Sequence, residues 1–479
     1  MNLKMVIRTV GRMLVVLALL LLLPMVCSLI YGEFTTALAF LFTAAGSAVI
    51  GAVLAFFIKT ENTVIYAREG FAITALVWLA MSALGAIPFV LTHSVPTYAD
   101  AFFETASGLT TTGASIMTDV DSLSHGILFW RSFTHWVGGM GVLVFVMAIV
   151  PNLSDRSIHI LRAEMPGPVV GKLVPRVRDT AKILYIIYIV MTAVQVIFLW
   201  AGGMPFFESL LHSFGTAGTG GFGIKNDSIT SYSPYIQWVI AVFMLLFGVN
   251  FNLYYMMLLR NFKGALRNTE LWFYLAMTAV STGLIAYNIH ASCPSVEASI
   301  RTAFFQTSSI ITTTGYATTD INGMPILSKG VLFLLMLSGG CAGSTAGGFK
   351  VARIVMLVQS AKRDLRRMLH PRSIGVVHMD GKRIDEETLQ SLSTYSSLYV
   401  GSLLLIFLLL CFEPFDFETN LSAAVSCFNN VGPAFGAAAA NYSAYSGPAK
   451  LLLSVAMLCG RLEIIPVFFA LSPSTWSRK

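Results

Sequence analysis

Apolar runs of about twenty residues recur along this chain, and they constrain its fold more than any other feature of the sequence. A run of this length is what an α-helix needs to cross the hydrocarbon core of a bilayer. The chain is 56% hydrophobic and only 11% charged, whereas an average soluble domain is about 25% charged. We therefore predict an all-α polytopic membrane protein. The net charge of +7 fits the orientation of such a protein better than nucleic-acid binding.

Four short glycine-containing segments lie between the apolar runs. Their sequences are Thr-Thr-Thr-Gly-Ala at 110–114, Thr-Gly-Gly-Phe-Gly at 219–223, Thr-Thr-Thr-Gly-Tyr at 312–316 and Asn-Val-Gly-Pro-Ala at 430–434. The third resembles the Thr-Val-Gly-Tyr-Gly selectivity filter of potassium channels, whose backbone carbonyls replace the hydration shell of the ion. Since one chain carries four copies, we expect a single subunit to build the whole ring.

The backbone carbonyls of these segments are the candidate ligands, with K+ as the expected transported ion. The candidate filter residues are Thr111, Thr112 and Gly113; Thr219, Gly220 and Gly221; Thr313, Thr314 and Gly315; and Asn430, Val431 and Gly432. Glycine permits backbone angles that let neighbouring carbonyls align. No Arg or Lys lies in these segments, so a cation is favoured. Paired glycines leave the register of the second segment open by one residue.

The surrounding pattern predicts four repeats of helix, pore loop and helix around a central pore, after an N-terminal pair of helices. We expect the pair near 12–32 and 36–58, and the repeat helices near 69–92 and 126–150, 183–202 and 235–258, 270–290 and 329–358, and 395–412 and 448–471. The expected units are the pair at 1–64 and the repeats at 65–155, 156–262, 263–383 and 384–479. Short segments such as 101–109 and 303–310 are predicted as re-entrant half-helices, with surface loops as the alternative.

The distribution of charge supports one topology. Ten crossings with a cytoplasmic N-terminus place all four filters outside and the C-terminus in the cytoplasm. The outer side then receives few basic residues, namely Arg131, Lys225, Arg301, Lys329 and Lys450, which follows the positive-inside rule. The basic inner segment 362–383 either contacts anionic lipid or docks a cytosolic regulator.

Carboxylates gather near the presumed outer mouth, where a ring of them would concentrate cations. They are Asp100, Glu104, Asp119, Glu208, Asp227, Glu297, Asp320, Asp416 and Glu418. The alternative is that they cap the N-terminal ends of the half-helices, where acidic residues are favoured in any case.

Residues 339–348 contain five glycines and predict a break in the second helix of the third repeat. The favoured interpretation is a flexible loop that gates the pore, and the alternative is close helix packing at small-xxx-small spacing. The candidate gate residues are Gly339, Gly340, Gly343, Ser344, Thr345, Gly347, Gly348 and Arg461. Arg461 lies inside the last apolar run, with Glu463 on another helix face, so it faces the pore or pairs with a neighbouring helix. We find no comparable glycine cluster in the other second helices.

Together these motifs resemble the Trk/Ktr/HKT superfamily of potassium uptake proteins, and most closely its bacterial TrkH branch. The resemblance implies a filter at the four glycines, a gating loop at 339–348 and a basic residue, Arg461, at the constriction. It also implies a homodimer with one pore per subunit in the bacterial cytoplasmic (inner) membrane, controlled by a cytosolic TrkA-like nucleotide-binding subunit. The chain itself carries no nucleotide-binding motif.

Three function classes compete. A channel-like K+ permease, through which Rb+ also passes, is the leading hypothesis. A secondary symporter coupled to H+ or Na+ remains the alternative, although coupled transporters tend to carry titratable groups at midplane sites and the filter segments hold none. A membrane enzyme is disfavoured, because the sequence shows neither paired catalytic carboxylates nor metal-spaced histidines. The six cysteines form no CxxC pair, and we expect no cofactor beyond the transported ion.

Overall fold

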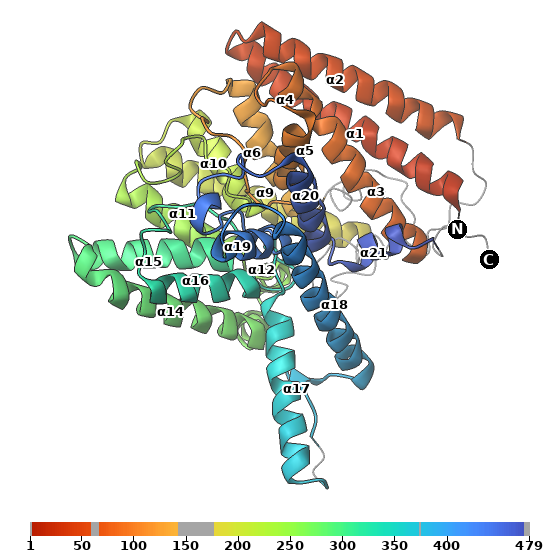
Figure 1. Cartoon of the computed structure of the whole chain (residues 1–479). Helices are drawn as coiled ribbons and strands as arrows, with labels where there is room; N and C mark the ends of the chain where they lie inside the picture. Colours follow the sequence, from red (N-terminus) through yellow and green to blue (C-terminus); the bar gives the residue numbers. More distant parts are fainter. Residues whose placement is uncertain (1, 59–66, 142–176, 373–374, 474–479) are drawn as a thin grey trace.

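The computed structural model describes residues 2–58, 67–141, 177–372 and 375–473, and these ranges are almost entirely helical (Figure 1). A hairpin of two very short strands, β1 (His378–Met379) and β2 (Lys382–Arg383), is the only sheet within them. The predicted all-α architecture is therefore confirmed. The predicted unit boundaries at 64 and 155 lie outside the described residues.

The first two helices form a tightly packed pair. α1 (Leu3–Ile30) and α2 (Phe34–Ala52) are joined by a short turn, and a π-helical turn (Val53–Phe57) extends α2. Gly11 and Gly51 let the two backbones touch, because a Cβ at Gly51 would meet the carbonyl oxygen of Gly11 at 2.7 Å and the nitrogen of Val15 at 2.8 Å. Small residues at a helix contact allow this close approach within a membrane.

The remaining helices form four groups, each with a short pore helix at its centre. The pore helices are α5 (Tyr98–Leu109), α10 (Phe206–Gly218), α15 (Val296–Ile311) and α19 (Phe417–Phe428). The first helices are α3 (Ala67–Gly85) with α4 (Ile87–Leu91), α9 (Val177–Ala201), α14 (Thr269–Ile289) with a 3-10 turn (His290–Ser292), and α18 (Glu386–Leu410). The second helices are α6 (His125–Gly139), α11 (Pro234–Phe247) with α12 (Phe251–Leu258), α16 (Ile326–Ser338) followed by α17 (Val351–Leu369), and α20 (Gly447–Arg461) with α21 (Ile465–Leu471). The short helix α13 (Phe262–Leu266) and a 3-10 turn (Gly436–Ala438) complete the set.

Breaks in the second helices are more widespread than the sequence predicted. The sequence predicted continuous helices near 235–258 and 448–471, and both are interrupted. α11 and α12 are bent by 89° around Gly248 and Asn250, and α20 and α21 are separated where Glu463 and Ile464 adopt φ values of 57° and 66°. The predicted helix 126–150 ends at Gly139, and its second half, 142–150, lies outside the described residues. Asn250 stabilises the break in repeat two, because its side chain accepts a hydrogen bond from the nitrogen of Asn252 at the start of α12.

These breaks change the number of continuous spans. Within the described residues, five helices are long and apolar enough to cross a membrane, or six if the bent pair α11–α12 counts as one span. Ten crossings were predicted. Part of the difference arises because α16 and α20 are each shorter than the roughly 20 residues that a bilayer requires. In addition, α6 ends next to residues outside the described ranges, and the unbroken α14 is long enough but is not among the helices counted as apolar.

The pore helices share a capping pattern that determines their direction. Thr97, Ser295 and Asp416 precede three of them, and each side chain accepts a hydrogen bond from a backbone N–H in the first turn. All four carry an acidic residue in that first turn, at Asp100, Glu208, Glu297 or Glu418. The opposite, C-terminal ends carry partial negative charge and lead directly into the four glycine-containing loops.

Replacement of Gly51 by Val is expected to destabilise the N-terminal pair, because the new side chain would overlap the backbone of α1. Overpacking of this kind costs about 1–3 kcal/mol. The matched control is Gly46→Val in the same helix, where a Cβ meets nothing within 4 Å. We expect the thermal midpoint of the purified protein in detergent to fall for Gly51→Val alone. Equal midpoints for the two variants would contradict the close backbone contact.

Candidate functional site

The four loops adopt one backbone conformation. The residues two before the glycine have φ values of 55° or 56°, and the glycines have φ values between 76° and 102°. The residues concerned are Thr111 and Gly113, Thr219 and Gly221, Thr313 and Gly315, and Asn430 and Gly432. Threonine rarely adopts positive φ, and strain of this kind concentrates at functional sites. Four matching pairs of left-handed residues indicate one structural element that is repeated four times.

A shared hydrogen bond ties each loop to its own pore helix. The residue before the glycine donates its N–H to the carbonyl of the residue six before the glycine, at 2.8 or 2.9 Å. The pairs are Thr112 with Ser107, Gly220 with Gly215, Thr314 with Ser309, and Val431 with Ser426. This contact and the φ values make Gly221, and not Gly220, the geometric equivalent of the other three glycines.

The loops close into a ring. Each glycine lies against the backbone oxygen of the residue that precedes the glycine in the next repeat, so that a Cβ at any of them would collide with that oxygen. The contacts run from Gly113 to Gly220, from Gly221 to Thr314, from Gly315 to Val431, and from Gly432 to Thr112. The predicted filter residues therefore come together in one place. Glycine is required there because the loops pack backbone against backbone.

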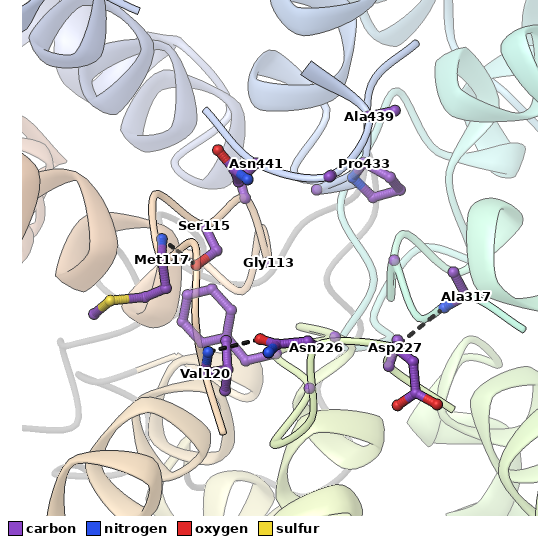
Figure 2. A pocket seen from close by; sticks show the side chains of 18 of the residues that line it. Gly113, Ser115, Met117, Val120, Asn226, Asp227, Ala317, Pro433, Ala439 and Asn441 are labelled. Carbon is purple, nitrogen blue, oxygen red and sulfur yellow. Dashed lines mark hydrogen bonds between the residues drawn. The ribbon is translucent and has the colours of Figure 1, made fainter. Parts of the chain in front are cut away.

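A cavity of about 550 Å³ opens onto this ring, and we call it the mouth cavity (Figure 2). Its lining includes the four ring glycines together with Arg131, Asn226, Asp227, Asp320 and Tyr442. Figure 2 shows Gly113 and Pro433, which come from different repeats, facing this space with Asn226 and Ala317. Asp227 and Asp320 are the acidic residues of its lining, and Arg131 and Lys225 are the basic ones.

Most of the predicted mouth carboxylates lie elsewhere. Five of them pair with the basic residues that were assigned to the outer side: Glu104 with Arg131, Asp100 with Lys450, Glu208 with Lys225, Glu297 with Arg301, and Glu418 with Lys329. Asp416 caps α19. Asp119 accepts a hydrogen bond from the Asn226 amide, which lowers the pKa of this exposed carboxyl. Of the nine, Asp227 and Asp320 line the mouth cavity.

The glycine-rich segment between α16 and α17 is an irregular loop that packs under the ring. We call residues 339–350 the intramembrane loop. The nitrogen of Gly347 donates to Oγ1 of Thr313 at 2.7 Å, and a Cβ at Gly347 would meet the carbonyl oxygen of Asn429 at 2.6 Å. Thr313 and Asn429 precede their glycines, so the loop covers the end of the ring opposite the mouth cavity. The helix-packing alternative for this segment is excluded by its irregular backbone.

Arg461 ties the intramembrane loop to another repeat. Its side chain is 5% exposed and donates to the carbonyl of Thr345 at 2.8 Å and to the carbonyls of Gly138 and Gly139. The latter two carbonyls end α6, where a positive charge is favoured by the helix dipole. Glu463 pairs instead with Arg353 on α17, at 2.6 Å. The guanidinium of Arg461 thus bridges the loop and the first repeat.

Glu270, at the start of α14, is a functional candidate that the sequence analysis did not single out. It is 2% exposed, and one carboxylate oxygen accepts from the nitrogens of Ala342 and Ala352 at 2.6 and 3.0 Å. The break between α11 and α12 holds the same part of the loop, because Cys341 donates to Gly248 and Phe251 donates to Gly343, both at 3.0 Å. A carboxylate at the start of an apolar run was the available sequence signal, but its partners are backbone groups that no side-chain pattern reveals.

Comparisons with known proteins agree over the whole chain. A sequence model of the TrkH family, described as cation transport proteins, matches residues 37–478. The Trk system potassium uptake protein TrkH of Salmonella typhimurium is 34% identical over 482 residues, which cover 99% of this chain and 100% of that protein. The Trk system potassium uptake protein TrkG of Escherichia coli is 33% identical over 460 residues, covering 95% of this chain and 94% of that protein.

A solved structure shows the same fold. The crystal structure of the potassium transporter TrkH from Vibrio parahaemolyticus superposes with a TM-score of 0.89, at 31% identity and with 100% of both chains covered. The resemblance to the TrkH branch is thereby confirmed. The chain belongs to the TrkH family of cation transport proteins, and it is a multi-pass membrane transporter rather than an enzyme.

Proposed function

We propose that this protein takes up K+ through one pore per subunit, that the ring of four loops is its selectivity filter, and that the intramembrane loop is its gate. The observation that carries the proposal is the closed ring, in which four loops of one backbone conformation pack glycine against carbonyl. Carbonyl oxygens held in this way can replace the hydration shell of a monovalent cation. Potassium is the ion named for the relatives TrkH and TrkG.

The filter residues act through their backbone. The carbonyls of 111–113, 219–221, 313–315 and 430–432 are the proposed ion ligands, and Rb+ passes as a close substitute for K+. The C-terminal ends of the four pore helices stabilise a cation at the ring by their partial negative charge. Asp227 and Asp320 raise the local cation concentration in the mouth cavity.

The intramembrane loop has an anchored part and a releasable part. Residues 341–343 are held by Glu270 and by the break between α11 and α12. Thr345 and Gly347, by contrast, are held by three hydrogen bonds. The carbonyl of Thr345 accepts from Arg461, its Oγ1 donates to the carbonyl of Phe247 at 3.2 Å, and the nitrogen of Gly347 donates to Thr313. In our proposal the gate opens when these three bonds break and the segment from Ser344 to Gly348 moves away from the ring. The flanking glycines at Gly339, Gly343 and Gly348 have positive φ and serve as hinges.

The cytosolic regulator is proposed to dock on α17 and the adjoining hairpin. α17 projects away from the helical body in Figure 1. Near its end, Lys362, Arg366 and Arg367 are exposed beside Leu365 and Met368, which are 63% and 79% exposed. Basic and apolar side chains that share an exposed helix end suit a protein partner, here a TrkA-like nucleotide-binding subunit. Because α17 begins at the intramembrane loop, a force on its far end reaches the gate.

The wider assembly follows the family pattern. We propose a homodimer in the bacterial cytoplasmic membrane, with both termini in the cytoplasm and the filters on the outer side. The units at 1–64, 65–155, 156–262, 263–383 and 384–479 then correspond to the N-terminal pair and the four repeats.

Rubidium uptake into liposomes tests the proposed function. The purified protein is reconstituted, and Rb+ uptake is driven by an opposing K+ gradient while external Na+ and H+ are varied separately. A channel-like pore requires the K+ gradient alone. Uptake that depends on a proton or sodium gradient would instead establish a secondary symporter.

Gly315→Ser is expected to lower the Rb+ to Na+ permeability ratio, because the new Cβ collides with the carbonyl oxygen of Val431 and opens the ring. A loss of about tenfold corresponds to one lost carbonyl contact of ~1.4 kcal/mol. Gly330→Ser on α16 is the matched control, since a Cβ there meets nothing within 4 Å. An unchanged ratio in Gly315→Ser would refute the filter.

Arg461→Gln is expected to increase uptake in the absence of any regulator, because the bond that holds Thr345 to the end of α6 is lost. Hydrogen bonds to charged groups contribute about 1.5–3 kcal/mol, so a rise of about tenfold is expected. The exposed Arg267→Gln serves as the control, and initial uptake rates are compared at equal protein density. Reduced or unchanged uptake in Arg461→Gln, with the protein folded, would show that this residue does not hold a gate closed.

Reversal of charge at the end of α17 is expected to uncouple the regulator. Arg366→Glu with Arg367→Glu should weaken co-purification of a TrkA-like subunit by at least about tenfold, since rim charges guide association. Basal uptake of the isolated protein should stay the same. Retained binding would place the docking surface elsewhere.

A further inference from the structure

A buried ion pair lies directly behind the first filter loop. Arg131 on α6 and Glu104 on α5 are 2% and 0% exposed, and Nε of the arginine lies 2.9 Å from Oε1 of the glutamate. Buried charges are costly unless they are paired and fully hydrogen-bonded, so a pair at this position calls for a reason beyond stability.

The guanidinium of Arg131 reaches two filter loops at once. Nη1 donates to the carbonyl of Gly223 at 3.1 Å, and Nη2 donates to Oγ of Ser115 at 3.2 Å. Ser115 follows Gly113 by two residues, and Gly223 follows Gly221 by two residues. The same position of two neighbouring loops is therefore held by one planar group, whose donors have a fixed spacing. The ring of Phe222 lies 4.3 Å from the guanidinium and closes the contact.

Glu104 completes the network from the side of the pore helix. Its carboxylate accepts from Oγ of Ser115 at 2.9 Å and from the nitrogen of Ile116 at 3.0 Å. The first loop is thus fixed to α5 by the carboxylate and to the second loop by the guanidinium.

The other repeats carry different residues at the position that corresponds to Arg131. Arg131 follows its ring glycine by eighteen residues, and the same offset reaches Val239, Phe333 and Lys450 in the other repeats. Lys450 pairs with Asp100, one turn before Glu104 on α5, at 2.6 Å. The ring has fourfold pseudo-symmetry in its backbone, but its charged supports converge on the pore helix of the first repeat.

We propose that Arg131 is a positioning residue for ion selection, which fixes the spacing between the first and second filter loops and is itself oriented by Glu104. The proposal rests on the filter described above. Without the two hydrogen bonds from the guanidinium to Gly223 and Ser115, the first and second loops can shift relative to each other. The oxygen cage can then contract around the smaller Na+, and discrimination between the ions falls.

Arg131→Lys is the decisive variant. It keeps the positive charge that neutralises Glu104, but it removes the planar guanidinium that binds Gly223 and Ser115 together. We expect its Rb+ to Na+ permeability ratio in liposomes to fall by about tenfold, the effect of losing hydrogen bonds to a charged donor. The thermal midpoint should remain near that of the wild type. Glu104→Asp, which shortens the carboxylate, should produce the same loss and takes the place of Arg131→Lys if that variant does not fold. Lys329→Gln, which removes a more exposed pair with Glu418, is the matched control.

Gly315→Ser in the same assay distinguishes a failure of the proposed filter from a failure of the positioning role of Arg131. If Gly315→Ser lowers the ratio and both Arg131→Lys and Glu104→Asp retain it, the positioning role is overturned while the filter stands. If Gly315→Ser also retains the ratio, the filter itself is refuted. A lowered permeability ratio in Arg131→Lys with an unchanged thermal midpoint supports the proposal. If the ion pair only stabilised the fold, Lys would replace Arg in it and the permeability ratio would not change.

Discussion

Within a bilayer, a backbone carbonyl without a hydrogen-bond donor is costly, yet a filter of the kind proposed here must leave several carbonyls for the ion. The structure resolves this conflict by enclosing irregular backbone in protein. Each loop returns one N–H to its own pore helix, as in the contact of Thr314 with Ser309, and each ring glycine packs on the backbone of the next loop. The strained φ values at Thr111, Thr219 and Thr313 persist because these contacts surround them on every side.

The same constraint explains why the second helices are interrupted. The end of α6, the bend between α11 and α12, the loop before α17 and the turn after α20 all expose backbone groups that need partners inside the protein. They supply partners for one another: Arg461 binds Gly138 and Thr345, while Gly248 accepts a hydrogen bond from Cys341. The intramembrane loop is therefore the meeting point of all four repeats, which makes it a suitable place to control a pore.

Side chains break the symmetry that the backbone nearly keeps. Two buried ion pairs, Arg131 with Glu104 and Lys450 with Asp100, converge on α5, whereas Glu270 and Arg461 act on the loop in the third repeat. A single chain with four unequal repeats can thus place buried ion pairs on one side of the ring and an irregular loop below another. A tetramer of identical subunits would have to repeat every such feature four times.

The sequence alone determined the membrane class, the four repeated loops and the positions of three of the four ring glycines, because apolar length and glycine conformation are local properties. It also located the glycine-rich loop at 339–348 and Arg461. Only the tertiary structure decided that Gly221 carries the register of the second loop, that α11 bends at Gly248, and that the carboxylates of Asp100 and Glu104 are paired inside the protein rather than open to the mouth cavity. These features depend on hydrogen bonds and ion pairs between repeats that lie about a hundred residues apart in the sequence. No local sequence pattern encodes such long-range contacts.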